Sequence, residues 1–467
     1  MSVACGGAAR GCVLAVLRDR NGSSSVWGWG DNDNGELGIG NHTYEYAADP
    51  TLANSHHAGA SEVQTAVVMV ACGPRHSCAV LADGRVFYWG RLLYDPASPR
   101  PLQADQCYAY AIPPARAGKP SRAVMAACGA SHTLVLTADG QVFSTGDYAS
   151  GATGFGREHF QNGCLVRVQA GGFQQVIVSM VAAGAHHSVA VDAGGGVWTW
   201  GRPRHGALGH GAEPADVSYE NTRSYTHALT TPRALGSALP GPVVMVAAAG
   251  CHTAAVHADG SLWVWGEGGA GQLGVGDQLD RLVPTQLARA ALSDLAVLTA
   301  ACGPHHSLLA TSDGGLWACG RSRGGVLGCG NGGRAPDAPD LPAPTRVAFF
   351  DRSADTRVVC IAAGARESVA VTVDGQIYTW GGDAGYLRPT RKPLPADMTA
   401  GCFLWLAARH CLAVAMGTQA RLMQGEGAEL GGDMVRRVLD PRGGVPGPAA
   451  RLAGIVRLLG GGLAAQP

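Results

Sequence analysis

The stretch VVMVACGPRHSCAVLADGRVFYWG, residues 67–90, contains the pattern on which the fold of this chain depends. Two short segments rich in β-forming residues, 77–81 and 86–90, flank the dipeptide Asp83-Gly84. Asp-Gly readily adopts the positive φ angles of a type I′ turn, whose twist matches that of the flanking strands. The stretch therefore predicts a β-hairpin that ends in Trp89-Gly90 and follows a further strand near residues 67–72.

The same pattern recurs along the chain, with an HS or HT pair, a turn that usually contains Asp-Gly, and an aromatic strand that usually ends in Trp-Gly. Successive units end at Gly30, Gly90, Gly146, Gly201, Gly266, Gly320 and Gly381. The intervals between these glycines are 54 to 65 residues. A weaker eighth unit ends at Gly425 and lacks both the Asp-Gly turn and the tryptophan. Such regularity indicates a repeat architecture.

Nine of the ten tryptophans lie in the second strand of a hairpin, which indicates a core position between neighbouring sheets. A small sheet of this kind buries its faces only when similar sheets pack against it. Because no helical period separates the units, we expect a single all-β propeller, which protects its sheet edges by closing into a ring. An open solenoid is the alternative. Eight hairpin units can be counted within residues 1–432, so the repeat by itself leaves seven or eight blades open.

The repeat resembles that of the regulator of chromosome condensation family, which is close to GxxHSLALTxDGxVWxWGxNxxGQLGxG. Residues 73–90 match its first part, and WGDNDNGELGIG (29–40) and WGEGGAGQLGVG (265–276) match its second. The resemblance covers about residues 3–432 and implies a seven-bladed propeller. Residues 433–467 form a Gly/Pro/Ala-rich tail, in which 445–462 resembles a first strand and is a candidate for closing the ring by pairing with the N-terminal strand.

Composition excludes several classes of function. The 35 basic and 35 acidic residues give a formal charge of zero, so no global field attracts nucleic acid or a membrane surface. Four of the 14 cysteines recur in an ACG frame and no CxxC pair occurs, which indicates small buried residues rather than disulfides or zinc ligands. No apolar run approaches a membrane span. We expect a monomer in the cytoplasm or nucleus. Residues 1–17 fit the repeat pattern, and a short signal peptide is the alternative interpretation of this segment.

No catalytic, metal or cofactor site is predicted. The repeat histidines occupy one fixed place per unit: His76, His132, His187, His252 and His306. A ring would spread them over separate blades, so we expect structural hydrogen bonds to the backbone rather than metal ligation. The tryptophans Trp89, Trp200, Trp265 and Trp380 are expected to be structural too. The GxGxxG match at residues 266–271 runs into the repeat instead of a helix.

The leading hypothesis is a non-catalytic scaffold that binds a protein partner through loops between the strands. Loops on a rigid scaffold commonly carry binding sites, and Tyr and Arg are frequent at hot spots. The long connections are residues 41–64, 91–121, 211–242 and 321–357, in which the candidate contact residues are Tyr44, Tyr46, Tyr219, Arg223 and Tyr225. The alternative is that these segments are solvated linkers.

The family resemblance implies a second hypothesis, guanine-nucleotide exchange on a Ran-like small GTPase. Acidic residues in loops after Trp-Gly act there in some members, and Asp33, Asp147 and Glu267 are the candidates here. The loop that contains Asp147 departs from the family pattern, and no inserted wedge is recognisable in 160–176. Chromatin binding is less expected because no basic tail precedes the first repeat. The GWRHT motif of ultraviolet-receptor relatives lacks its tryptophan at 73–77.

Overall fold

The computed structural model describes residues 3–6, 11–18, 23–39, 47–53, 66–91, 108–110, 122–147, 150–156, 165–211, 228–330, 339–351, 354–382, 386–394 and 399–400. The chain divides into compact units at residues 1–403 and 404–467, and every described residue belongs to the first. The degenerate eighth repeat unit, the boundary at 432/433 and the strand at 445–462 lie outside the described residues and stay predictions.

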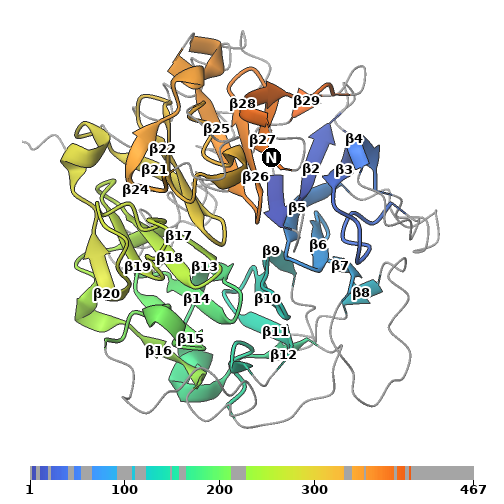
Figure 1. Cartoon of the computed structure of the whole chain (residues 1–467). Helices are drawn as coiled ribbons and strands as arrows, with labels where there is room; N and C mark the ends of the chain where they lie inside the picture. Colours follow the sequence, from blue (N-terminus) through green and yellow to red (C-terminus); the bar gives the residue numbers. More distant parts are fainter. Residues whose placement is uncertain are drawn as a thin grey trace, which may run out of the picture. The chain divides into compact units, whose positions relative to one another are not determined.

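Seven antiparallel sheets, the blades, are arranged in a ring, as predicted (Figure 1). Blade 1 contains β1 (Val3–Gly6), β2 (Cys12–Arg18), β3 (Ser24–Gly30) and β4 (Ala47–Leu52); blade 2 contains β5 (Val67–Cys72), β6 (His76–Leu81), β7 (Val86–Gly90) and β8 (Tyr108–Tyr110); blade 3 contains β9 (Ala123–Cys128), β10 (His132–Thr137), β11 (Val142–Gly146) and β12 (Val166–Arg167). Blade 4 contains β13 (Val178–Ala183), β14 (His187–Asp192), β15 (Val197–Gly201) and β16 (Leu229–Ala234); blade 5 contains β17 (Val243–Ala249), β18 (His252–His257), β19 (Leu262–Gly266) and β20 (Arg281–Gln286). Blade 6 contains β21 (Val297–Cys302), β22 (His306–Thr311), β23 (Leu316–Gly320) and β24 (Leu341–Arg346); blade 7 contains β25 (Val358–Ala363), β26 (Glu367–Thr372), β27 (Ile377–Gly381) and β28 (Tyr386–Arg391).

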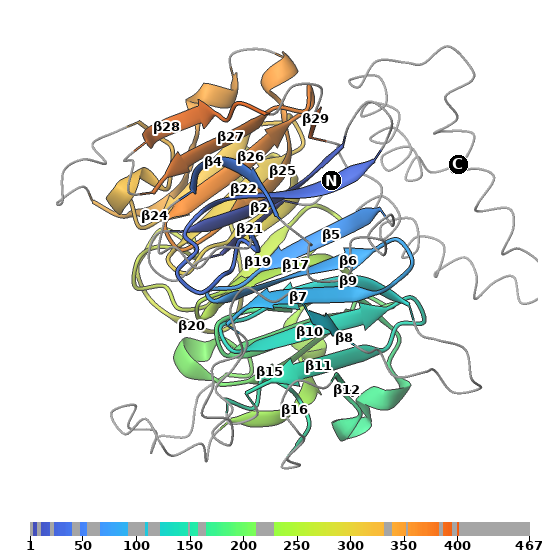
Figure 2. The ribbon, with the colours of Figure 1, turned by 90° about the vertical axis from the view of Figure 1, so that its right-hand side faces the viewer.

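In each blade the strands follow chain order from the axis to the rim, and the first strands contact one another around the ring. Figure 2 shows the ring from the side, with blades 2 and 3 towards the viewer. The helical elements are short 3-10 turns: η2 (Ala170–Gln175), η3 (Arg204–Gly206), η4 (Gly236–Ala238), η5 (Arg289–Leu292), η6 (Arg323–Gly325), η7 (Ala348–Asp351) and η8 (Ala354–Thr356). Among the residues that the structure describes, no helix has the length and apolar character needed to span a membrane.

The hydrophobic core consists of seven separate clusters, one at each interface between neighbouring blades. In β2, Val13 and Ala15 pack towards blade 7, whereas Leu14 and Val16 pack towards blade 2. This alternation follows from the two-residue period of a strand. Since both faces of the second strand are buried, its residues from Cys12 to Leu17 are apolar and show no polar alternation.

The ring closes in blade 1 through two chain segments. β1 pairs with β2 from Cys12 to Ala15, and β29 (Thr399–Ala400) pairs with β2 at Leu17 and Arg18. Because β3 occupies the other edge of β2 over its whole length, β1 and β29 must share one edge. The innermost strand of blade 1 is therefore composed of an N-terminal piece and a piece from residues 399–400, which joins the two ends of the repeat region.

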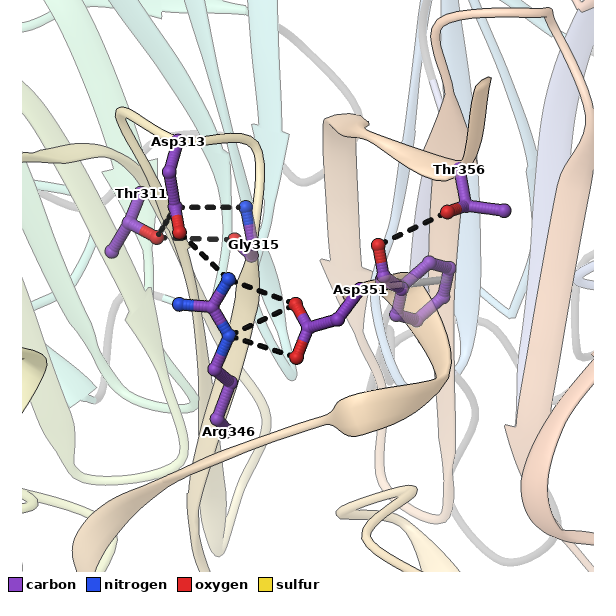
Figure 3. A network of polar contacts seen from close by, with 7 residues as sticks. Thr311, Asp313, Gly315, Arg346, Asp351 and Thr356 are labelled. Atoms are coloured by element: carbon purple, nitrogen blue, oxygen red, sulfur yellow. Dashed lines mark hydrogen bonds and ion pairs between the residues drawn. The ribbon is translucent and has the colours of Figure 1, made fainter. Parts of the chain in front are cut away.

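An ion-pair network supports the connection from blade 6 to blade 7 (Figure 3). Arg346 at the end of β24 contacts the carboxylate of Asp313, in the Asp-Gly turn, at 2.7 Å and that of Asp351, in η7, at 2.8 Å. The Asp313 carboxylate also accepts hydrogen bonds from Thr311 Oγ1 at 2.7 Å and from Gly315 N at 3.0 Å. The arginine thus joins the outer strand, the hairpin turn and the linker of the two blades.

Candidate partner-binding face

Each repeat histidine contacts a hydroxyl group of the next blade through its Nε2 atom. The pairs are His76 with Thr133 (2.9 Å), His132 with Ser188 (2.9 Å), His187 with Thr253 (3.0 Å), His252 with Ser307 (2.9 Å) and His306 with Ser368 (2.9 Å). The repeat pattern predicted hydrogen bonds from these histidines to the backbone; this prediction is wrong for Nε2, whose partner is a side chain of the neighbouring sheet. The Ser or Thr that follows the histidine in blades 3 to 6 contacts the histidine of the preceding blade, which explains why the HS or HT pair recurs as a unit.

The serine of each pair fixes the direction of these hydrogen bonds. Ser188 Oγ donates to Ala152 O at 2.7 Å, and Ser368 Oγ donates to Val326 O at 2.7 Å. Since a hydroxyl has only one proton, the serine oxygen accepts from the histidine, which therefore carries its proton on Nε2. The interfaces that contain Ser188, Ser307 and Ser368 are thus joined by a chain of two hydrogen bonds that ends on a carbonyl of the preceding blade's loop.

The repeat tryptophans donate to the same loop carbonyls. The bonds run from Trp89 Nε1 to Glu36 O (2.8 Å), from Trp200 to Ala152 O (2.8 Å), from Trp265 to Ala207 O (2.9 Å) and from Trp380 to Val326 O (2.7 Å). A glycine two residues after the carbonyl makes room for the indole: a Cβ on Gly154 would lie 2.8 Å from Trp200 Nε1. The loop after the third strand of one blade is thereby fixed on the next blade.

Burial keeps the histidines neutral. It lowers the pKa of His76 and His306 to about 4 and that of His132, His187 and His252 to about 3. A neutral imidazole suits the donor role but not catalysis near pH 7. Within the described ranges, no three His, Cys, Asp or Glu side chains gather closely enough to hold a metal ion.

Two blades have another residue at the histidine position. Cys12 pairs with Gly30 in blade 1, and Glu367 pairs with Gly381 in blade 7, in the register in which His76 pairs with Gly90. Cys12 and Glu367 each lie at an interface of blade 1, the blade in which the ring closes. The interfaces on either side of blade 1 therefore lack the histidine–hydroxyl bond that joins the other five.

The turn before each second strand and the connection after each third strand lie on one face of the ring, which we call the loop face. On this face, the first residue of each connection donates its backbone N–H to the turn residue of the same blade. The pairs are Asp31 with Gly11 O (2.6 Å), Arg91 with Arg75 O (2.8 Å), Asp147 with Ser131 O (2.8 Å), Arg202 with His186 O (2.9 Å), Glu267 with Cys251 O (3.0 Å), Arg321 with His305 O (2.8 Å) and Gly382 with Arg366 O (2.7 Å). Seven equivalent positions thus surround the axis.

The side chains at these positions alternate in charge. Asp31, Arg91, Asp147, Arg202, Glu267 and Arg321, which we call the charged ring, are acidic and basic in turn from blade 1 to blade 6. Arg91 and Arg321 are exposed, Asp147, Arg202 and Glu267 are half-buried, and Asp31 is buried. Blade 7 has Gly382 at this position, which interrupts the alternation.

Charged-ring residues of two neighbouring blades shift the pKa of the same histidine, which lies between them. Burial lowers the pKa of His186, an effect that Arg202 of the same blade strengthens and Asp147 of the preceding blade opposes. Burial and Arg321 lower the pKa of His305 in the same manner, against Glu267 of blade 5. Charged-ring residues of blades 3 and 4 thus act on a shared histidine between them, and those of blades 5 and 6 do the same.

Only two of the candidate partner-binding residues that were predicted from the sequence lie in the charged ring. Asp147 and Glu267 belong to the charged ring. Asp33 does not: it is exposed at the tip of the blade 1 loop, and its N–H lies 3.3 Å from the carboxylate of Asp31, which holds the equivalent position. The candidates Tyr44, Tyr46, Tyr219, Arg223 and Tyr225 lie outside the described residues. The alternation cannot be recognised in the linear sequence because successive members are 54 to 65 residues apart and only the ring brings them together.

The comparisons with known proteins agree with this architecture. Residues 98–423 match the model of the RCC1-like domain, and residues 23–80 match that of the regulator of chromosome condensation (RCC1) repeat. The chain is a member of the RCC1-like family. The ultraviolet-B receptor UVR8 of Arabidopsis thaliana is 31% identical over 366 residues, which cover 76% of this chain and 72% of the receptor. The mitochondrial RCC1 domain-containing protein RUG3 of the same plant is 29% identical over 76% of this chain and 75% of its own.

Solved structures show the same RCC1-like fold. Human WBSCR16 superposes with a TM-score of 0.62 at 26% identity, covering 80% of this chain and 87% of that one. Yeast RCC1 (Prp20) from a complex with Kap60 gives a TM-score of 0.63 at 22% identity, covering 85% of this chain and 91% of that one. The mouse ubiquitin ligase HERC2 is 34% identical over 54% of this chain, but the match spans only 5% of the ligase.

Proposed function

We propose that this RCC1-like protein is a non-catalytic interaction module that binds a protein partner through its loop face. The observation that carries the proposal is the charged ring, whose sign alternates over six consecutive blades. A partner with a complementary arrangement of charges gains specificity and a faster encounter from such a surface. The hydrogen bonds that fix the loops of blades 1, 3, 4, 5 and 6 on the next blade make these parts of the surface rigid, which lowers the entropic cost of binding.

The opposite face contains the Asp-Gly turns, whose carboxylates bind residues of their own turns. Asp83 binds Arg85, Asp139 binds Gln141, and Asp259 accepts from Ser261 at 2.7–2.9 Å. The loop face is the better candidate for recognition because it contains the charged ring, whose sign alternates from blade to blade.

The proposal is tested by reversing two charges of the ring. The double variant Asp147→Arg with Glu267→Arg should no longer capture the partners that the wild-type chain captures by proximity labelling in its native host. The matched control, Gln174→Arg with Gln175→Arg, adds arginines at exposed positions of η2, in a linker on the opposite face. If both variants retain the same partners, or if the wild type captures none above background, the proposal is wrong. Capture should also weaken at 0.5 M salt, where charges are strongly screened.

A second candidate is nucleotide exchange on a Ran-like GTPase. It is favoured by the family resemblance together with the acidic residues Asp147 and Glu267 in loops after the third strand. Exchange predicts accelerated release of labelled GDP from such a GTPase, with a reduced rate for Asp147→Ala. An unchanged release rate at micromolar protein removes this candidate and leaves the interaction module intact.

For the compartment and assembly, we propose a monomer in the cytoplasm or nucleus. Ten cysteines of the described region are free thiols, which agrees with a reducing environment. Nucleic acid is not a favoured partner because the chain has no net charge.

A further inference from the structure

The interface between blades 1 and 2 contains two thiols, one of which takes the place of the histidine that five other interfaces contain. Cys12 occupies the histidine position of blade 1. Its Sγ lies 2.9 Å from the Sγ of Cys72, the last residue of β5 in blade 2. The hydroxyl that a histidine would contact belongs to Ser77, which donates to Glu36 O at 2.8 Å, as Ser188 does to Ala152 O, and lies 3.2 Å from Cys72 Sγ.

The local backbone makes room for this approach. Gly6, which pairs with Cys12 across β1 and β2, has no side chain, and a Cβ there would lie 2.7 Å from Cys72 Sγ. The Cys72 sulfur is therefore packed directly against the Gly6–Cys12 pair. The next interface has a looser thiol pair, Cys78 and Cys128, with 3.4 Å between the sulfur atoms.

We propose that Cys12 and Cys72 are a disulfide site that covalently joins blade 1 to blade 2 when the protein meets an oxidising thiol–disulfide pool. The sulfur atoms need to approach by only about 0.9 Å to reach bonding distance. Blade 1 is the blade in which the ring closes, and its innermost strand comes from two chain segments. The bond therefore reinforces the closure of the ring.

The oxidant is a low-molecular-weight disulfide such as oxidised glutathione, and the reaction proceeds by two exchange steps. Cys72 is half-buried and Cys12 is buried, so Cys72 reacts first. Its thiolate attacks one sulfur of the oxidant, forms a mixed disulfide and releases one molecule of thiol. The Cys12 thiolate then attacks Cys72 Sγ, forms the protein disulfide and releases the second thiol. Two protein thiols lose two protons and two electrons, and the oxidant gains both.

Burial raises the pKa of the Cys12 thiol well above its ordinary value. The second exchange step requires the thiolate, so bond formation should be slow at pH 7 and faster at pH 8.5. The disulfide is therefore expected under sustained oxidation rather than as a rapid signal.

The full chain, incubated with oxidised glutathione and then alkylated and digested without reductant, tests the proposal. The expected product is a peptide pair linking Cys12 to Cys72, with an unfolding midpoint raised by roughly 5 °C and restored by dithiothreitol. Cys72→Ser should abolish both changes. Cys128→Ser, which alters the same ACG frame at the next interface, should leave both in place.

The proposal is overturned if Cys12 and Cys72 remain alkylatable after oxidation, or if the linked peptides contain other cysteine pairs. It is equally overturned if the Cys12–Cys72 link appears only after the chain has been unfolded. If the Cys72→Ser variant fails to fold, the test still holds, because the peptide map of the wild-type chain decides by itself which cysteines are paired.

Discussion

The imidazole of His132 in blade 3 lies with its Nε2 atom 2.9 Å from the hydroxyl of Ser188 in blade 4. That hydroxyl in turn donates to Ala152 O, in the loop that follows the third strand of blade 3. One buried side chain thus joins the second strand of its own blade, the next blade and the loop between them. Five of the seven interfaces contain this arrangement, so it contributes to the cohesion of the whole ring.

Replacing His132 by alanine should destabilise the protein by about 2–4 kcal/mol, because the variant loses a buried hydrogen bond and leaves a cavity. Urea unfolding followed by tryptophan fluorescence measures the loss. The control is Ser131→Ala at the adjacent, half-buried turn residue, which should change the free energy of unfolding by less than about 0.5 kcal/mol. Equal effects of the two variants would show that the histidine does not stabilise the interface.

Two buried tryptophans allow the contribution of the indole hydrogen bond to stability to be measured separately from that of packing. Trp200 and Trp29 are both buried, but Trp200 Nε1 donates to Ala152 O, whereas Trp29 Nε1 has no partner among the described residues. Trp200→Phe should therefore cost about 1 kcal/mol more free energy of unfolding than Trp29→Phe. Thermal or urea unfolding of the two variants measures the difference, and a larger loss for Trp29→Phe would contradict it.

Gly154 and Gly172 both have positive φ angles, 78° and 82°. A Cβ on Gly154 would lie 2.8 Å from Trp200 Nε1, whereas nothing lies within 4 Å of one on Gly172. Gly172→Ala should cost about 1 kcal/mol from backbone strain alone. Gly154→Ala should cost roughly 3 kcal/mol, since the loop must also move away from the indole. Similar midpoints in urea for the two variants would refute the proposed contact between loop and indole.

Stability should fall steeply in mild acid. Burial lowers the pKa of His187 to about 3, against about 6.5 in the unfolded chain. Above pH 6.5 both states are neutral and the full stability is present; below it only the unfolded state binds the proton, so stability is lost towards pH 3. Each buried histidine contributes a slope on the order of 1 kcal/mol per pH unit. Urea midpoints between pH 8 and 5 measure this slope, and His187→Gln should reduce it. If the slope for His187→Gln equals that of the wild type, His187 takes up protons in the folded state, and the prediction is wrong.

The hairpins and their apolar second strands were predictable because their signals are local. Asp-Gly sets the turn, and the strand between two sheets is mainly apolar after its initial HS or HT pair. The outer strands were not predicted: β16 and β24 lie inside segments that the sequence analysis assigned to loops. These rim strands are partly exposed and contain Pro232 and Pro344, so they lack both the apolar pattern and the β-propensity of the inner strands.

By itself, the sequence determined the repeat and the all-β class, because each unit folds through contacts between neighbours in the chain. The repeat left seven or eight blades open, and the structure shows seven. Only the tertiary structure decided which side chains meet across blades. The hydroxyl partner of each histidine, the alternating charged ring and the contact between Cys12 and Cys72 join residues about 50 to 65 positions apart. A linear pattern does not fix such contacts, since they depend on the rotation from each blade to the next and on where the ring closes.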